Sequence, residues 1–168
     1  MNTLRTQSKL NARSRLIITS MLYLFIAAIG TLIAIKENLP SVTFIPAFIT
    51  GKQALEDFLT GNGTALSPPL YLCIPTVLLL ILACLHNRLA MIGIVGLTIL
   101  GAIFLLGIFA EKLTYRVLNP ATFDFHLASV ELLAIVLPLL MIVFGGMEIA
   151  HWRRVAIQNA GESSRIEK

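Results

Sequence analysis

The sequence predicts an all-α fold: an integral membrane four-helix bundle with a short amphipathic helix in the first outer loop. The 168 residues are 57% hydrophobic and 13% charged, whereas soluble domains are about half apolar and a quarter charged. The mean hydropathy is +0.84. The apolar excess is concentrated in four segments, 16–35, 70–85, 89–110 and 132–147. Because hydrocarbon offers the backbone no water, such segments must be helices.

Each apolar segment is long enough, or nearly so, to cross ~30 Å of hydrocarbon at ~1.5 Å per residue. A single membrane domain over residues 1–154 therefore contains four predicted helices, at about 14–36, 68–86, 88–111 and 126–150. The polar remainder, residues 155–168, is predicted to be a flexible cytoplasmic tail.

The basic residues predict the orientation of the chain. One side of the four spans carries nine of them: Arg5, Lys9, Arg13, Arg15, Arg88, Arg153, Arg154, Arg165 and Lys168. The other side carries only Lys36, Lys52, Lys112 and Arg116. The positive-inside rule then predicts a multi-pass cell-membrane protein with both termini in the cytoplasm. It also explains the net charge of +4 without a nucleic-acid partner.

The first helix has two interpretations. Its basic start and the small residues Ala28 and Gly30 allow a cleaved secretory leader. Its apolar run continues to Ile35, which is long for a leader and favours an uncleaved span. A stripe of small residues suits close helix packing: Ala27, Gly30, Thr31 and Ala34.

The first outer loop, residues 37–67, contains a predicted short helix at 52–60. Its apolar residues form one stripe, and Gly61 ends it. The stripe consists of Ala54, Leu55, Phe58 and Leu59. This segment either lies flat on the outer membrane interface as an amphipathic helix or is a loop tucked onto the bundle.

The second and third helices form a predicted hairpin. Ser67 and Pro68 suit the start of the second helix, and Pro75 removes a helical hydrogen bond, which predicts a kink. Only residues 86–88 separate the second apolar run from the third. The two helices must therefore be antiparallel neighbours joined on the cytoplasmic side.

The fourth helix carries its polar residues on one line. Asp124, Glu131, Pro138 and Gly145 recur every seven residues, which places them on nearly one face. Charged residues inside a membrane face the bundle interior or a water-filled cavity. We therefore expect this line to face the other helices, with a second kink at Pro138.

The third helix predicts a cluster of polar residues at the outer face of the bundle. Gly93, Gly96, Gly107 and Glu111 share a face, which we expect to pack against the fourth helix and to bring Glu111 near Glu131. Lys112, Arg116, Asp124 and His126 would complete the cluster. The two carboxylates would then share a proton, since like charges in one site repel. Alternatively, they bond to loop backbone or pair with Lys112 and Arg116.

No motif predicts a catalytic, metal or cofactor site. The sequence contains no nucleophile elbow, phosphate loop or dinucleotide fingerprint. Glu148 and His151 form one Glu-x-x-His step, but a di-metal bundle needs two such steps and two more carboxylates. We therefore predict neither a metal nor a cofactor.

The pattern of spans resembles that of small four-span bacterial inner-membrane proteins, and this resemblance assigns no functional residue. We expect a non-enzymatic accessory, scaffold or interaction subunit, in contact with the lipid bilayer and with a membrane-protein partner or a second copy. One alternative is a small proton-coupled or small-molecule transporter that uses Glu131 and Glu111. Another is an enzyme acting on a lipid or quinone in an outer-facing pocket, with His126 as acid or base.

Overall fold

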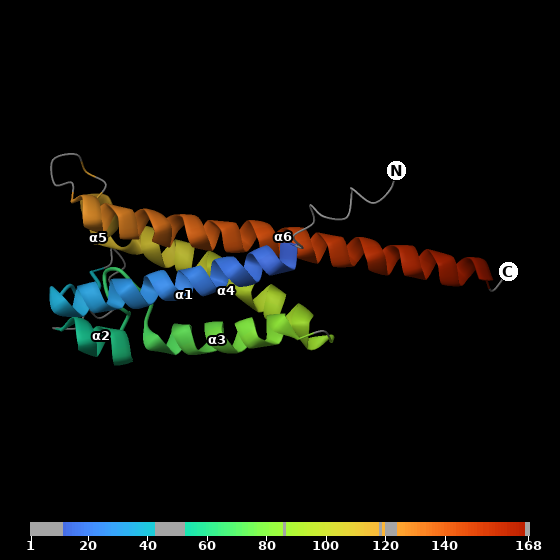
Figure 1. The fold of residues 1–168 in the computed structure, drawn as a ribbon, viewed down its shortest axis with the longest axis horizontal. Coiled ribbons are helices and arrows are strands. Elements are labelled where there is room, and N and C mark those ends of the chain that lie inside the picture. The colour runs from blue at the N-terminus through green and yellow to red at the C-terminus, as the bar shows by residue number, and fades with distance from the viewer. Residues whose placement is uncertain (1–11, 43–52, 86, 118, 120–123, 167–168) are drawn as a thin grey trace.

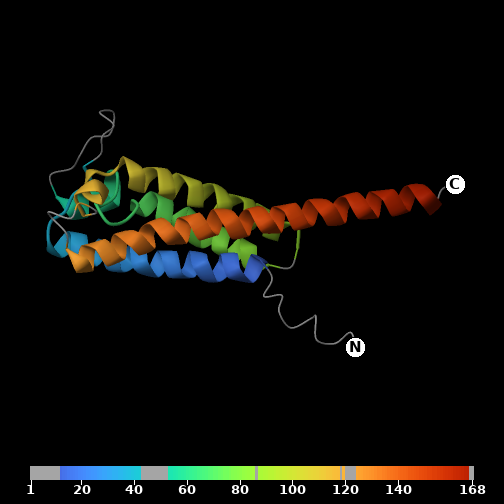
Figure 2. The same cartoon turned by 90° about the horizontal axis from the view of Figure 1, so that it is seen from above.

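The computed structural model describes residues 12–42, 53–85, 87–117, 119 and 124–166. Helices α1, α3, α4 and α6 lie side by side, and the short helices α2 and α5 lie at the same end of the bundle (Figures 1 and 2). Helix α2 contacts α1 and α3, and α5 contacts α4 and α6. This part of the chain forms no strand, and its helices are α1 (Ala12–Lys36), α2 (Ala54–Thr60), α3 (Leu70–Cys84), α4 (Leu89–Ala110), α5 (Lys112–Val117) and α6 (Phe125–Ile166).

The helices occur where the sequence predicts them, with two differences. The loop after α4 contains α5, which the sequence analysis did not predict. The predicted end of the last helix at 150 is wrong, because α6 continues to Ile166 through the segment that we expected to be a flexible tail. Residues 150–160 contain neither glycine nor proline, so nothing in this stretch interrupts the helix. Flexibility of residues 155–168 stays a prediction.

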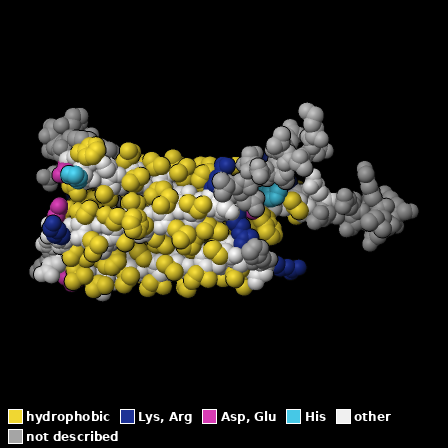
Figure 3. Space-filling view, viewed as in Figure 1, with side chains coloured by type: hydrophobic (Ala, Val, Ile, Leu, Met, Phe, Trp, Pro, Cys, Tyr) yellow, Lys and Arg dark blue, Asp and Glu magenta, His cyan; other side chains and the backbone are white. Residues whose placement is uncertain are grey.

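Three helices in the described residues are long and apolar enough to cross a membrane: α1, α4 and residues 125–158 of α6. The fourth predicted span, α3, has 15 residues and is about 22 Å long. Pro75 lies inside α3 and Pro138 inside α6, and both helices continue through them; the predicted kinks stay predictions. Hydrophobic side chains cover the middle of the visible face, and charged side chains gather at its two ends (Figure 3).

Helices α3 and α4 approach each other most closely at Gly93. A Cβ atom added there would collide with the backbone of Leu79 and Ala83 in α3, and one added at Gly96 would meet the Leu79 side chain. Gly107, about three turns beyond Gly96 along α4, has no such neighbour within 4 Å. The prediction that Gly93, Gly96 and Gly107 face the fourth helix is therefore wrong, because α3 covers the first two.

Helix α4 packs against α6 through other small residues. A Cβ atom at Gly101 would lie 3.0 Å from the carbonyl oxygen of Pro138, and one at Gly145 would collide with Thr98. Glu131, Pro138 and Gly145 are all buried. For these three residues, the prediction that the line faces the other helices is confirmed. It is wrong for Asp124, the fourth residue of the line, which is exposed and lies just before the start of α6.

The basic start of α1 is tied to the end of α3. The Arg13 guanidinium donates hydrogen bonds to the carbonyl oxygens of Ala83, at 2.9 Å, and of Leu85. These are carbonyls that the end of a helix leaves without an intrahelical partner.

Between the two ends of the bundle lies a buried apolar core: Leu16, Tyr23, Ala83, Ile94, Leu97, Leu100, Phe104, Leu137 and Met141.

The contact at Gly93 gives a test of this packing. We expect Gly93→Ala to lower the free energy of unfolding by about 1–3 kcal/mol, because the added methyl group must push α3 and α4 apart. The measurement is SDS-induced unfolding of the protein in mild detergent. Gly146→Ala is the matched control, since a Cβ atom at Gly146 on α6 meets nothing within 4 Å. Equal stability of the two variants would contradict the packing.

Candidate functional site

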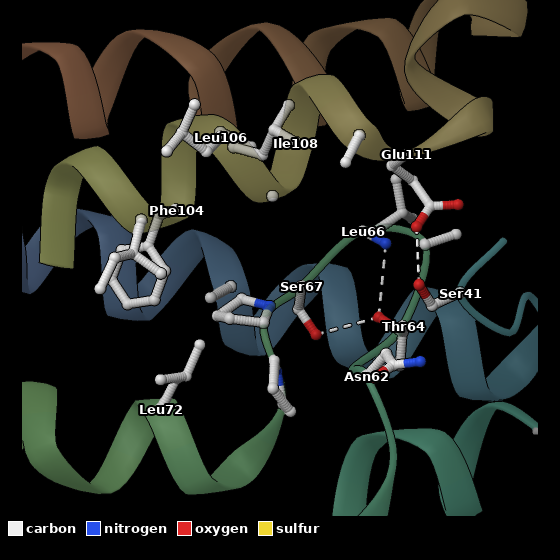
Figure 4. A pocket seen from close by; sticks show the side chains of 18 of the residues that line it. Ser41, Asn62, Thr64, Leu66, Ser67, Leu72, Phe104, Leu106, Ile108 and Glu111 are labelled. Carbon is white, nitrogen blue, oxygen red and sulfur yellow. Dashed lines mark hydrogen bonds between the residues drawn. The ribbon is translucent and has the colours of Figure 1, made fainter. Parts of the chain in front are cut away.

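A cavity of about 460 Å³ opens at the end of the bundle that holds α2 and α5. Its volume is within the range of ~300–1,000 Å³ that is usual for ligand pockets. Its walls come from α1, α3, α4, α6 and the segment 62–69. Ser41, Thr64 and Glu111 lie toward one end of the cavity and Leu72 and Phe104 toward the other (Figure 4). The site is therefore polar at one end and apolar at the other.

The cavity exists because α4 moves away from α3 toward this end. At Gly107, which lines the cavity, the helix surface is exposed and a Cβ atom would meet open space. Toward the core, the rings of Tyr23 and Phe104 stack with centroids 4.6 Å apart. On the other side of the cavity, the segment 62–69 packs directly against α1. A Cβ atom added at Gly30 of α1 would be only 2.5 Å from the carbonyl oxygen of Leu66.

Glu111 connects the end of α4 to the segment that follows α1. One carboxylate oxygen accepts a hydrogen bond from the Ser41 hydroxyl and the other from the Val42 backbone N–H, both at 2.7 Å. The N–H of Lys112 donates in turn to the carbonyl oxygen of Val42, at 2.9 Å. Glu111 is only 6% exposed. It is thus bonded to loop backbone, which was one of the two arrangements considered from the sequence.

Glu131 is held by α5. Its side chain is 2% exposed, and the Thr114 hydroxyl contacts one of its carboxylate oxygens. The same hydroxyl lies 2.8 Å from the carbonyl oxygen of Ile108 at the end of α4. Glu131 also lies near enough to Glu111 and Tyr23 for electrostatic interaction. The short helix α5 therefore positions the hydroxyl partner of the carboxyl group that α6 buries.

Hydroxyl groups extend the polar end of the cavity. The oxygen of Ser67 lies 2.7 Å from that of Thr31 and 2.9 Å from that of Thr64. Thr31 also donates to the carbonyl oxygen of Ala27, at 2.9 Å. A hydroxyl group can both donate and accept a hydrogen bond. The direction of the hydrogen bonds among these three hydroxyl groups can therefore change when a polar group binds.

The predicted outer-face cluster is divided in the structure. The two glutamates line the same cavity. Asp124 instead caps α6, where its side chain accepts from the backbone N–H groups of His126 and Leu127, at 2.9 and 3.3 Å. His126 is exposed and is not among the cavity residues, and the Lys112 side chain is exposed. The Arg116 side chain lies outside the described part of the structure.

Four of the cavity residues were not predicted from the sequence: Tyr23, Ser41, Thr64 and Ser67. Neither was Thr114, which does not line the cavity but contacts Glu131. Only Tyr23 had a usable signal. It lies four residues before Ala27, on the small-residue stripe of the first helix, so helical periodicity alone places it on the buried face. The hydroxyl residues come from loops and from α5, where the sequence has no periodicity to indicate a direction.

The described residues contain no group of three or more His, Cys, Asp and Glu side chains that could hold a metal ion. Glu148, from the Glu-x-x-His step, is buried at the opposite end of the bundle. Its carboxylate accepts a hydrogen bond from the Trp152 indole, at 3.2 Å. The step therefore contributes a carboxylate contact within α6 at the end of the bundle opposite the cavity.

Comparison with known proteins finds no family model that matches the chain, and no curated protein or solved structure with significant similarity to it.

The bonds of Glu111 lead to a stability prediction. Glu111→Ala leaves the Val42 N–H without its acceptor, and we expect it to lower the free energy of unfolding by about 1–3 kcal/mol. Glu111→Gln keeps one acceptor oxygen and should cost less. The readout is SDS-induced unfolding together with amide hydrogen exchange at Val42, which should accelerate in the alanine variant. Glu56→Ala, at an exposed position of α2, is the control. Unchanged protection of the Val42 amide would contradict this role.

Proposed function

We propose that the chain crosses the membrane four times, with both termini in the cytoplasm. Exposed apolar surface supports insertion: only 33–39% of the most apolar part of each of the three long candidate spans is buried inside the bundle. Helix α1 begins, and α6 leaves the bundle, at the same end (Figures 1 and 2). Arg13, Arg88 and Arg153 belong to this end. Helix α3 would be the fourth span, extended by its flanking residues.

Within this topology, we propose that the protein is a non-enzymatic accessory protein that binds a small amphiphilic molecule from the outer half of the bilayer. The observation that carries this proposal is the cavity of about 460 Å³ with Glu111 and hydroxyl groups at one end and apolar walls at the other. Two of its apolar residues, Tyr71 and Leu106, are exposed on the bundle surface. Such a cavity is open to molecules dissolved in the lipid.

The alternatives have less support. Scaffolding through glycine-rich helix faces loses its main argument, because Gly93, Gly96, Gly101 and Gly145 contact neighbouring helices of the same chain. Transport would need a polar path beyond the cavity, where the described residues form an apolar core. An enzyme with His126 as its acid or base would need that residue in the cavity, which it does not line.

Terminal fusions test the topology. We expect reporters fused to the first and last residues to be both cytoplasmic, because an even number of spans returns the chain to its starting side. Activity of a periplasmic reporter such as alkaline phosphatase, compared with a fluorescent cytoplasmic reporter, measures this. Opposite compartments for the two ends would mean that α3 does not cross, and the proposed topology would fail.

A cavity-filling variant tests binding. We expect the protein in nanodiscs of zwitterionic lipid to bind tritiated decanol saturably above empty nanodiscs. Gly107→Phe should reduce this affinity by about tenfold or more, a loss of ~1.4 kcal/mol or more. The phenyl ring enters open space at the cavity wall, so folding should be preserved.

Gly146→Phe is the matched control for this experiment. Gly146 is exposed on α6, also has no neighbour within 4 Å of an added Cβ atom, and does not line the cavity. It should bind decanol as the unmodified protein does. Absence of saturable decanol binding, or an equal loss of affinity in both variants, would contradict the proposed function.

A further inference from the structure

We infer that the cavity selects single-chain amphiphiles with a cationic, hydrogen-bond-donating head group, such as a primary ammonium, over those with an anionic head. This inference rests on the proposed function and specifies its ligand class. It is carried by the charge and hydrogen-bonding state of the polar end of the cavity.

The charged side chains that line the cavity are both acidic. Among the described residues, its lining includes Glu111 and Glu131 and contains no lysine, arginine or histidine. A carboxylate that is removed from water is costly unless an opposite charge or enough donors compensate it. A cationic head group would supply that compensation, whereas an anionic head would add a second like charge to the site.

Glu111 is arranged as an ionised carboxylate that can accept more hydrogen bonds than the protein donates to it. Each of its oxygens accepts one hydrogen bond, from Ser41 and from Val42. An ionised carboxylate has about four lone-pair sites, so two remain for a ligand. An ammonium group has only donors to offer and can use both of these sites. Ser41 and Val42 thereby fix the position of the carboxylate before the ligand arrives.

Glu131 contributes differently, because of the proton on Thr114. The Thr114 oxygen contacts both the Ile108 carbonyl oxygen and a Glu131 carboxyl oxygen, yet a hydroxyl group has one proton to donate. Both contacts are satisfied when Glu131 carries a proton and donates it to Thr114, which then donates to Ile108. The polar end then holds one net negative charge, which a single ammonium group neutralises.

The apolar part of the cavity accommodates the chain of such a ligand. Leu72 and Phe104 lie away from Glu111 (Figure 4), and Leu106 leads to the exposed surface of α4. An alkyl chain placed there would leave its head group at the carboxylate. This polarity matches an amphiphile that enters from the lipid with its head toward the outer membrane surface.

The experiment compares three probes with the same chain and different head groups. Tritiated decylamine, decanol and decanoate are titrated at neutral pH into the full-length protein in zwitterionic nanodiscs, with empty nanodiscs subtracted. We expect decylamine to bind about tenfold or more tighter than decanol, equivalent to ~1.4 kcal/mol, and decanoate to bind weakest. Glu111→Gln should lower the decylamine affinity to that of decanol. Glu37→Gln, at an exposed position outside the cavity, should leave the ranking unchanged.

The outcomes separate this inference from the proposed function. Decanoate binding as tightly as decylamine, or a decylamine preference that survives in Glu111→Gln, would overturn the selectivity while leaving the binding site in place. If none of the three probes binds saturably, the proposed function itself fails. If Glu111→Gln does not fold, the head-group ranking of the unmodified protein decides the matter. Glu131→Gln replaces a carboxyl group that is already neutral and should leave that ranking unchanged.

Discussion

The close contact of α3 with α4 at Gly93 is the constraint on which the rest of the structure depends. Because a Cβ atom there would collide with the α3 backbone, the two helices can touch at this level. Further along, α4 moves away from α3 and packs on α6 through Gly101. The space left between α3 and α4 is the cavity. Small residues thus decide which helices touch and where they separate.

The buried acids show how the same bundle accommodates polar groups. Glu111 is compensated by Ser41 and Val42 of the segment after α1, and Glu131 by Thr114 of α5. Both sets of hydrogen-bond partners come from connecting segments that fold back over the end of the bundle. These connections therefore do more than join helices, since they supply the hydrogen bonds without which the two carboxyl groups would be costly to bury.

Much of the cavity could not have been predicted from the sequence. Heptad spacing correctly placed Glu131, Pro138 and Gly145 on the inner face of α6, since that periodicity belongs to a single helix. It failed for the glycines of α4, because a helix with small residues on several faces does not specify which neighbour each face contacts. The same heptad line also included Asp124, whereas His126 was grouped with the glutamates because it lies near them in the sequence. In the structure, Asp124 caps α6 instead.

What the sequence determined by itself is local: the helical class, the approximate limits of the apolar segments, and the face of α6 that carries its polar line. These follow from hydropathy and from the helical repeat, which depend on neighbours within a few turns. What only the tertiary structure decided is which helices touch, that Glu111 bonds to Ser41 and Val42 some 70 residues away, and that a cavity remains between α3 and α4. Those features depend on the relative positions of segments distant in the chain, which no local pattern encodes.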